Sequence, residues 1–392
     1  MLQPPRRVLP VIIISQLAGT SLWFAGNAVL ADLQRSLALP DSFLGHMTAA
    51  VQLGFIAGTL VFAVLAISDR YSPRATFLIC ALLGAACNAV TYFLEGSAAL
   101  LITARVGVGF FLAGIYPVGM KIASGWYRQN LGMALGFLVG ALVLGTALPH
   151  LIRGMDQSLP WQTVMLSVSA IAALGGLLMY ALVPDGPFLV AAAKFDPRSL
   201  ATIFRSSGFR ASSFGYFGHM WELYAFWAFV PPLLVAYAAR TADASFNISL
   251  LSFAVIAAGA IGCVVGGYLS LRIGSARVAF VQLFASGLCC LASPLLFYAA
   301  PALFLPFLLF WGVVVVGDSP QFSALNARHA PADQVGSALT IANCIGFGIS
   351  IVSIQLLNQT ASAIPAHYLF LLLVPGPIFG LWSLRPLLSR DA

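Results

Sequence analysis

The chain has 392 residues, of which 60% are hydrophobic and only 8% are charged. This composition excludes a water-soluble globular protein, in which about 25% of residues are ordinarily charged. The net charge of +7 at pH 7 does not indicate nucleic-acid binding, because the basic residues lie in short loops between apolar segments rather than on one face. Apolar runs such as 256–269 lack the alternation of a transmembrane β-barrel, which is also excluded.

Apolar segments of about 20 residues follow one another along the chain, and each is long enough to cross a bilayer as a helix. The first six cover 9–31, 46–67, 75–94, 98–120, 131–152 and 161–183, and the second six cover 212–236, 246–269, 277–298, 302–323, 334–357 and 367–385. We therefore expect an all-α integral membrane protein with twelve transmembrane helices. Its parts are an N-terminal six-helix bundle (1–183), a cytoplasmic linker loop (184–210) and a C-terminal six-helix bundle (211–392).

The basic residues are distributed unequally between the two sides of these spans. Fifteen of the 19 Lys and Arg lie on the side of the N-terminus, three (Arg35, Arg153 and Arg240) lie on the other side, and Arg105 falls within a span. We therefore expect a multi-pass protein of the cytoplasmic (inner) membrane with both termini cytoplasmic. The apolar run after Arg7 continues to Leu30, so we interpret it as the first span rather than a cleaved signal peptide.

Three short segments of the first half recur in the second half at an offset of about 203 residues. They are Ser68 to Arg74 with Ser270 to Arg277, Gly114 to Pro117 with Gly317 to Pro320, and Leu131 to Leu135 with Val335 to Leu339. Two bundles related by such a parallel repeat are the arrangement that a rocking transporter needs, with its binding site between the halves.

These segments resemble motifs of the major facilitator superfamily of secondary transporters. The loop Asp69-Arg70-Tyr71-Ser72-Pro73-Arg74 is similar to the family's signature after the second helix, and 267–274 repeats it without the acid. The run Arg105-Val106-Gly107-Val108-Gly109 is similar to the family's intramembrane arginine motif. The resemblance covers nearly the whole chain, and it implies that the first, fourth, seventh and tenth helices line a central cavity.

Arg105 is the first of three ionisable side chains predicted deep within spans, where lipid does not tolerate a charge. It shares a helical face with Tyr116 of the same span. Two interpretations stay open: the guanidinium binds a carboxylate or phosphate of a substrate, or it bonds the carbonyls of a neighbouring helix.

Glu222 and His219 lie three residues apart in the most polar and aromatic stretch of the seventh span. Because they share a face, the imidazole could hold or release a proton for the carboxylate. The alternative is that Glu222 bonds backbone at a kink while His219 only packs. Copper binding by His219 and Met220 is disfavoured, since no second Met or His follows one turn later, and we expect no metal site and no cofactor.

Asp318 shares a stripe with Gln321 in the tenth span, where Pro320 should open backbone carbonyls. It could pair with Arg105 or Lys121 across the halves as a gate, bind a cationic group of a substrate, or lie at the cytoplasmic rim.

Polar and aromatic side chains complete the predicted cavity. The first span carries a seam at helical spacing, made of Gln16, Thr20, Trp23 and Asn27. Trp23, Tyr224 and Trp227 are candidate cavity walls, although such residues also serve as interfacial anchors. In the signature loop, the residues that we expect to act as a conformational gate are Asp69, Arg70 and Arg74.

Together these features predict a secondary active, proton-coupled symporter of a small polar or anionic organic solute. Glu222 would load a proton and Arg105 would hold an anionic group. The alternative is a proton-antiport exporter of amphipathic compounds or drugs, which phenylalanines such as Phe226 favour and incomplete antiporter glycines in the fifth span oppose. No nucleotide-binding loop occurs, and five scattered histidines do not indicate an enzyme. Expected partners are the solute, protons and the lipid bilayer, with no nucleic acid, and we expect a monomer.

Overall fold

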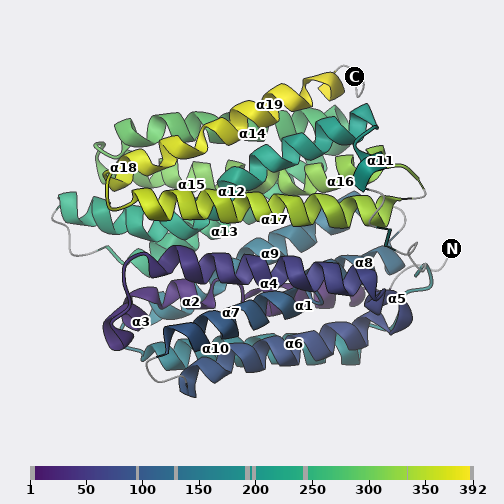
Figure 1. Cartoon of the computed structure of the whole chain (residues 1–392), viewed down its shortest axis with the longest axis horizontal. Coiled ribbons are helices and arrows are strands. Elements are labelled where there is room, and N and C mark those ends of the chain that lie inside the picture. The colour runs from purple at the N-terminus through teal and green to yellow at the C-terminus, as the bar shows by residue number, and fades with distance from the viewer. Residues whose placement is uncertain are drawn as a thin grey trace. The chain divides into compact units, whose positions relative to one another are not determined.

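The computed structural model describes residues 5–93, 97–127, 131–189, 195–196, 200–241, 246–332 and 334–388. Over these ranges the regular structure is helical throughout, and the predicted all-α fold class is confirmed. The chain divides into two compact units, Met1–Asp196 and Pro197–Ala392, whose helices are labelled in Figure 1.

The predicted spans correspond to helical segments of the structure. Within the described ranges, eleven helical segments are long and apolar enough to cross a membrane. The first span is instead divided into an apolar helix of 13 residues, α1 (Val8–Thr20), and two short helices, α2 (Ala25–Ala28) and α3 (Leu30–Leu37). The structure therefore agrees with twelve spans in two six-helix bundles.

The helices of each unit follow the predicted order. The first unit continues with α4 (Phe43–Val64), α5 (Ile67–Arg70), α6 (Pro73–Ala89), η1 (Val90–Phe93), α7 (Ala98–Leu112), α8 (Tyr116–Trp126), α9 (Leu131–Met155) and α10 (Trp161–Leu182). The second contains α11 (Leu200–Ile203), α12 (Ser207–Thr241), α13 (Ile248–Ile273), α14 (Ser275–Leu296), α15 (Pro301–Gly317), α16 (Ser319–His329), α17 (Val335–Thr360), α18 (Ala366–Leu369), η3 (Phe370–Leu373) and α19 (Pro375–Leu388).

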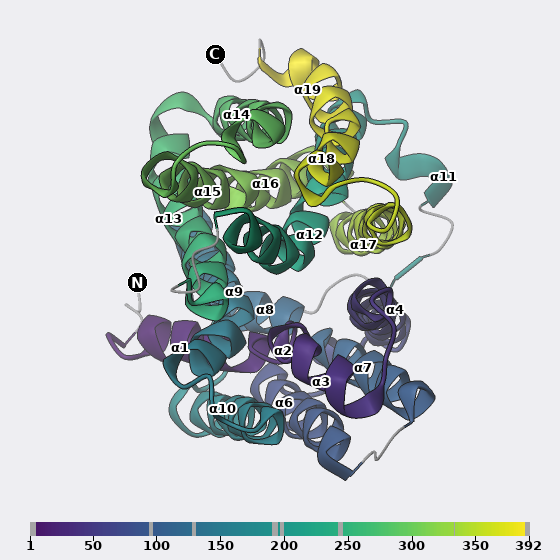
Figure 2. The same ribbon diagram turned by 90° about the vertical axis from the view of Figure 1, so that its left-hand side faces the viewer.

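The two units pack their helices in the same way, as the end-on view in Figure 2 lets the reader follow. In the first unit α1 packs on α9 and α10, α4 on α7, and α6 on both α7 and α10. In the second unit α12 packs on α17 and α19, α13 on α15, and α14 on both α15 and α19. Each of these contacts in one unit thus has its counterpart in the other, in agreement with the repeat in the sequence.

Two glycines at equivalent places let helices approach closely in both units. A Cβ atom at Gly109 of α7 would lie 2.0 Å from the carbonyl oxygen of Val51 on α4. A Cβ atom at Gly312 of α15 would lie at the same distance from the carbonyl oxygen of Val255 on α13. Small residues let helix backbones approach closely in membranes, so both glycines hold equivalent helix pairs together.

Three spans are interrupted near their middle. The fourth span breaks between α7 and α8, and the tenth breaks at Asp318 between α15 and α16. In each case a proline, Pro117 or Pro320, lies in the first turn of the following helix, where its missing N–H costs nothing. The first span breaks at 21–24, where the sequence contains no proline and gives no comparable signal.

The seventh span begins earlier than the sequence indicated. Helix α12 starts at Ser207 rather than near 212, so its first turn extends into the expected linker. Arg210 is accommodated there because its side chain is exposed and donates to the carbonyl of Phe204, 2.9 Å away. The remaining part of 184–210 is described only at 184–189, 195–196 and 200–206.

Candidate functional site

Arg105 is fully buried on α7, in the middle of the first unit. Its Nη2 donates to the carbonyl oxygens of Leu22 (2.9 Å) and Trp23 (2.7 Å), in the break of the first span. Its Nη1 donates to Oδ1 of Asn88 on α6, 3.0 Å away. Of the two interpretations open from the sequence, bonding to carbonyls of a neighbouring helix is the one that these contacts match.

Asn88 extends this network to a fourth helix. Its Nδ2 donates to the carbonyl oxygen of Met165 (2.9 Å) and to the hydroxyl of Ser169 (3.0 Å), both on α10. All of these groups are buried. We call Arg105, Asn88, Ser169 and the carbonyls of Leu22 and Trp23 the Arg105 cluster. Asn88 was not predicted as a site residue, although a single amide in an apolar span is a usable signal.

The polar seam of the first span is buried but not continuous. Gln16 and Thr20 lie on α1, Trp23 lies in the break, and Asn27 lies on α2. The Nδ2 of Asn27 donates to the hydroxyl of Thr48 on α4 at 2.8 Å, and the Trp23 ring packs on Phe55 with centroids 5.0 Å apart. The helical spacing predicted one straight face, and the break divides it.

Glu222 is buried on α12, where one carboxylate oxygen collects three donors. Oε1 accepts from the Ser286 hydroxyl, from the Cys290 thiol at 3.3 Å and from the Trp311 indole N–H at 3.1 Å. The same indole N–H lies 3.2 Å from the Ser286 hydroxyl. These four residues, the Glu222 cluster, join α12 to α14 and α15, and the three donors to the acid are neutral.

His219 contacts Asp318 rather than Glu222, so the predicted pairing within α12 is corrected. Its Nδ1 lies 2.8 Å from Oδ1 of Asp318, and both side chains are 1% exposed. The reason is the break of the tenth span, which places Asp318 against α12, while Glu222 turns toward α14 and α15. Gln321, one turn beyond Asp318, is also buried.

The partners suggested for Asp318 belong to the first unit and bond within it. Arg105 is held in its own cluster, and Nζ of Lys121 lies 2.5 Å from Oδ1 of Asp69. Lys121 also donates to the carbonyl of Ser68 at 2.7 Å. Asp69, one of the predicted gate residues, therefore ties the signature loop to α8.

The other gate residues lie at the same end of the first unit. Nε of Arg74 lies 3.7 Å from Oδ2 of Asp185, which also accepts from the Ser72 hydroxyl at 3.0 Å. Arg70 is exposed. The sequence did not single out Asp185, because it lies more than a hundred residues from its partners.

Two of the aromatic wall candidates, Tyr224 and Trp227, lie close to each other. Tyr224 and Trp227 are buried on α12 with ring centroids 5.4 Å apart, and Tyr224 contacts Phe347 of α17 at 5.2 Å. Tyr116 begins α8 beyond the break and is half-buried. Within the described ranges no group of three or more His, Cys, Asp or Glu side chains could hold a metal ion.

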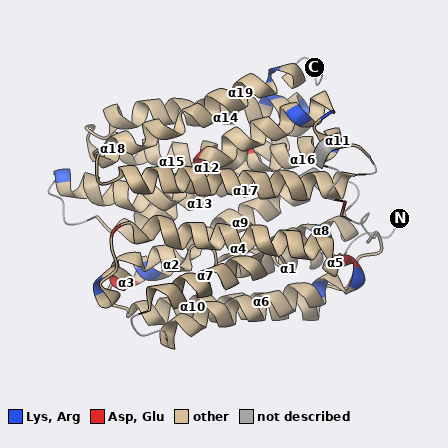
Figure 3. Ribbon diagram, in the orientation of Figure 1, with Lys and Arg blue, Asp and Glu red and all other residues tan. Residues whose placement is uncertain are grey.

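Charged groups are otherwise concentrated at the helix ends, as Figure 3 shows.

The sequence profile of the Major Facilitator Superfamily matches residues 11–354, and the chain belongs to this family.

Curated proteins similar to this chain are named as transporters. The chain is 27% identical over 192 residues, 47% of its length, to the "Uncharacterized transporter YgaY" of Escherichia coli O157:H7. It is 24% identical over 189 residues, 42% of its length, to the "Probable L-galactonate transporter" of Escherichia coli K12. These matches cover 48% and 40% of the relatives, so the chain spans about half or less of the curated relatives it matches.

Solved structures share the fold over nearly their whole length. The proton:xylose symporter XylE, bound to 6-bromo-6-deoxy-D-glucose, has a TM-score of 0.72 at 15% identity, covering 98% of this chain and 96% of XylE. The human organic anion transporter MFSD10 has a TM-score of 0.68 at 17% identity, covering 97% of this chain and 100% of that one. At these identities the likeness shows the fold alone.

Proposed function

We propose that the chain is a secondary active, proton-coupled transporter of a small polar or anionic organic solute that works by alternating access. The Glu222 cluster is the observation that carries this proposal. An ionised carboxylate in a membrane span is costly, and the three donors to Glu222 are a hydroxyl, a thiol and an indole, none of them a cation. An acid held by neutral donors can be occupied with or without its proton, which is what coupling requires.

The His219 and Asp318 pair supplies a second proton-holding group on the same helix. Histidine is the side chain best suited to gaining and losing a proton near physiological pH, and Nδ1 of His219 lies 2.8 Å from Oδ1 of Asp318. Asp318 also caps the end of α15, at the break before α16. A proton gained or lost there would change the contact that holds the break against α12, and this supports a role in moving the tenth span.

The first span supplies the groups that suit a polar solute. Within the described ranges, both amide atoms of Gln16 and the amide oxygen of Asn27 are buried without a hydrogen-bond partner. Buried amides ordinarily find partners, and hydroxyl or carboxylate groups of a solute would provide them. We propose that Arg105 has an indirect role in solute binding. It holds the break of the first span, which contains Trp23 and precedes α2, the helix that carries Asn27.

The signature loop completes the cycle. We propose that Asp69, Arg70 and Arg74 act as the conformational gate at the cytoplasmic side, with Lys121 and Asp185 as their partners within the first unit. We further propose that both termini are cytoplasmic and that the protein works as a monomer in the cytoplasmic (inner) membrane.

L-galactonate is the first solute to test, since one relative is named for it. Purified protein is reconstituted in liposomes, and L-galactonate uptake is compared with and without an inward proton gradient. We expect the gradient to stimulate uptake by the wild type and to have no effect on Glu222→Gln. Asp41→Asn, which neutralises an exposed acid, serves as the matched control and should behave as the wild type. Equal stimulation of Glu222→Gln would refute the coupling role.

The aromatic cluster of Tyr224, Trp227 and Phe347 favours a second candidate, a proton-antiport exporter of amphipathic compounds. Expression of the chain in a strain sensitive to hydrophobic cations distinguishes the two. An exporter protects the strain against these compounds, whereas the proposed importer leaves their inhibitory concentration unchanged.

A further inference from the structure

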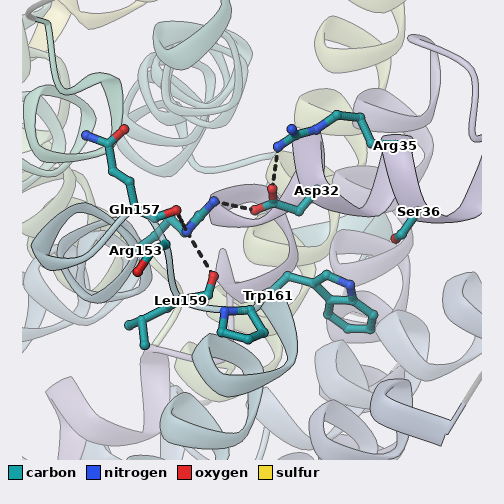
Figure 4. Close-up of a pocket in the computed structure, with 9 residues that line it drawn as sticks. Asp32, Arg35, Ser36, Arg153, Gln157, Leu159 and Trp161 are labelled. Atoms are coloured by element: carbon teal, nitrogen blue, oxygen red, sulfur yellow. Dashed lines mark hydrogen bonds and ion pairs between the residues drawn. The ribbon is translucent and has the colours of Figure 1, made fainter.

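A polar pocket lies at one end of the first unit, where α3 meets the loop between α9 and α10. Its volume is about 470 Å³. Figure 4 shows the residues that line it, which are Asp32, Arg35, Ser36, Arg153, Gln157, Ser158, Leu159, Pro160 and Trp161. None of these residues belongs to the Arg105 cluster, to the first-span seam or to the proposed gate.

Asp32 is shared between the two arginines of this pocket. Its Oδ1 lies 2.5 Å from Nη2 of Arg35, and its Oδ2 lies 2.9 Å from Nη2 of Arg153. Arg153 is 14% exposed, and its Nη1 donates to the carbonyl oxygens of Gln157 (2.6 Å) and Leu159 (3.0 Å). Arg153 therefore balances Asp32 and holds the loop in place.

Arg35 is the exposed arginine of the pocket. Its side chain is 76% exposed, and it uses Nε for the carbonyl of Ala31 and Nη2 for Asp32. The lining contains one acid and two arginines, and Asp156, next to Gln157, interacts electrostatically with Arg153. Surface ion pairs contribute little to stability, so Arg35 is not needed to hold this structure together.

The location of this charge is unusual for a membrane protein. The charge pattern predicts only three basic residues on the outer side, and two of them, Arg35 and Arg153, meet in this pocket. Loops on the outer side ordinarily lack Lys and Arg. Membrane topology therefore does not explain why two arginines meet beside one acid in this pocket. Trp161 adds an aromatic surface, and Gln157 and Ser36 add exposed polar groups.

We propose that this pocket of the first unit is an outer capture site for a small hydroxylated organic carboxylate before its transport. This inference rests on the proposed transport function. Arg35 would bind the carboxylate through donors that Asp32 does not occupy, Gln157 and Ser36 would bind hydroxyl groups, and the Trp161 ring would cover an apolar face of the solute. The positive charge would also raise the rate of encounter with an anion.

The test locates binding by nuclear magnetic resonance, independently of transport. The full chain is labelled with ¹⁵N at its tryptophan indoles and placed in nanodiscs of phosphatidylcholine, and Trp161→Phe identifies the Trp161 resonance. We expect L-galactonate to shift this resonance and neutral L-galactose to leave it in place. Arg35→Gln should weaken the binding about fivefold. Arg240→Gln, which removes an exposed arginine of the other unit, should have no effect.

The same variants are then compared in proteoliposomes. Arg35→Gln should raise the KM for L-galactonate severalfold at unchanged kcat, and the difference should shrink at high salt because the attraction is screened. An unshifted Trp161 resonance, or an equal shift in Arg35→Gln, overturns the capture site. A shift produced by inorganic phosphate or phosphatidylglycerol but not by L-galactonate overturns it as well.

These outcomes separate the capture site from the proposed function. If Trp161 responds to L-galactonate and no uptake occurs, the pocket stands and the proposed function fails. If proton-coupled uptake occurs and Trp161 does not respond, the proposed function stands and the pocket fails.

Discussion

The Arg105 cluster and the Glu222 cluster occupy equivalent places in the two units but carry opposite charges. Arg105 lies on the fourth span and bonds the first and third, through Leu22, Trp23 and Asn88. Glu222 lies on the seventh span and bonds the ninth and tenth, through Ser286, Cys290 and Trp311. The repeat thus preserves which helices meet at a buried charge, while the sign of the charge and the helix that carries it differ.

The difference follows from the backbone of the first helix in each unit. The first span is broken at 21–24, and its carbonyl oxygens accept from a cation. Helix α12 is continuous through Glu222, so its backbone groups are satisfied and side chains must supply the donors. An arginine keeps its charge under all conditions, whereas an acid with neutral donors can exchange a proton. We infer that the first unit uses its charge to hold structure and the second uses its charge for coupling.

The largest expected effect is on stability, from removing the cation of the first unit. Arg105→Met would leave two carbonyls and the Asn88 amide without their donor, and we expect the free energy of unfolding to fall by about 3–5 kcal/mol. Unfolding in mixed detergent micelles measures it. Arg105→Lys, which keeps the charge, should recover part of the loss. If the methionine variant is as stable as the wild type, the structural role assigned to Arg105 is wrong.

An intermediate effect is expected from the neutral partners of each cluster. Asn88→Leu removes the link between Arg105 and α10 and should cost about 1–3 kcal/mol. Ser286→Ala should cost less, about 1 kcal/mol, because Trp311 and Cys290 still donate to Glu222. The same unfolding assay compares them. A larger loss of stability in Ser286→Ala than in Asn88→Leu would contradict the proposal that the first unit uses its charge for structure and the second uses its charge for coupling.

How much of this arrangement the sequence predicts depends on the range of the interaction. Span lengths, the repeat and the depth of Arg105, Glu222 and Asp318 follow from local hydropathy, because lipid does not tolerate charge. The pairings of Arg105 with Asn88, of Glu222 with Ser286 and of Asp69 with Lys121 were not predicted, since each joins two different helices and depends on how those helices pack. The break at 21–24 contains no proline that would predict it. Since Arg105 bonds carbonyl oxygens within this break, its bond to the first span was not predicted either.

A smaller effect is expected at the tight turns of the first unit. Ala38 and Ala66 both have φ of 49°, in the left-handed region, whereas the second unit places Gly274, with φ of 85°, at its signature loop. A Cβ atom disfavours this conformation, so Ala66→Gly should stabilise the protein by about 1 kcal/mol. Thermal unfolding checks the increase, and Ala63→Gly, within helix α4, should destabilise instead. Equal effects of the two variants would argue against strain at Ala66.

The smallest expected effect concerns the loop between α9 and α10 of the first unit. Hydrogen bonds from the hydroxyl and the N–H of Ser158 hold the pKa of the Asp156 carboxyl below its usual value. A lowered pKa means that the contribution to stability is present above the unfolded value and is lost as the pH falls through the folded one.

Ser158→Ala should therefore raise the pKa of Asp156 toward its usual value, as measured by ¹³C resonance of the carboxyl. Ser158→Thr, which keeps the hydroxyl, is the control. The corresponding loop of the second unit, 361–365, contains no acid and should show no such titration. An unchanged pKa in Ser158→Ala would show that Ser158 does not set it.

The most direct test of the division between the units is a measurement of proton movement alongside solute exchange. L-galactonate is added to proteoliposomes that contain a pH dye, and counterflow of the solute is followed in parallel. We predict that Glu222→Gln abolishes proton movement and retains counterflow, whereas Arg105→Lys lowers both in the same proportion. Proton movement that persists in Glu222→Gln, or is lost selectively in Arg105→Lys, would contradict the account.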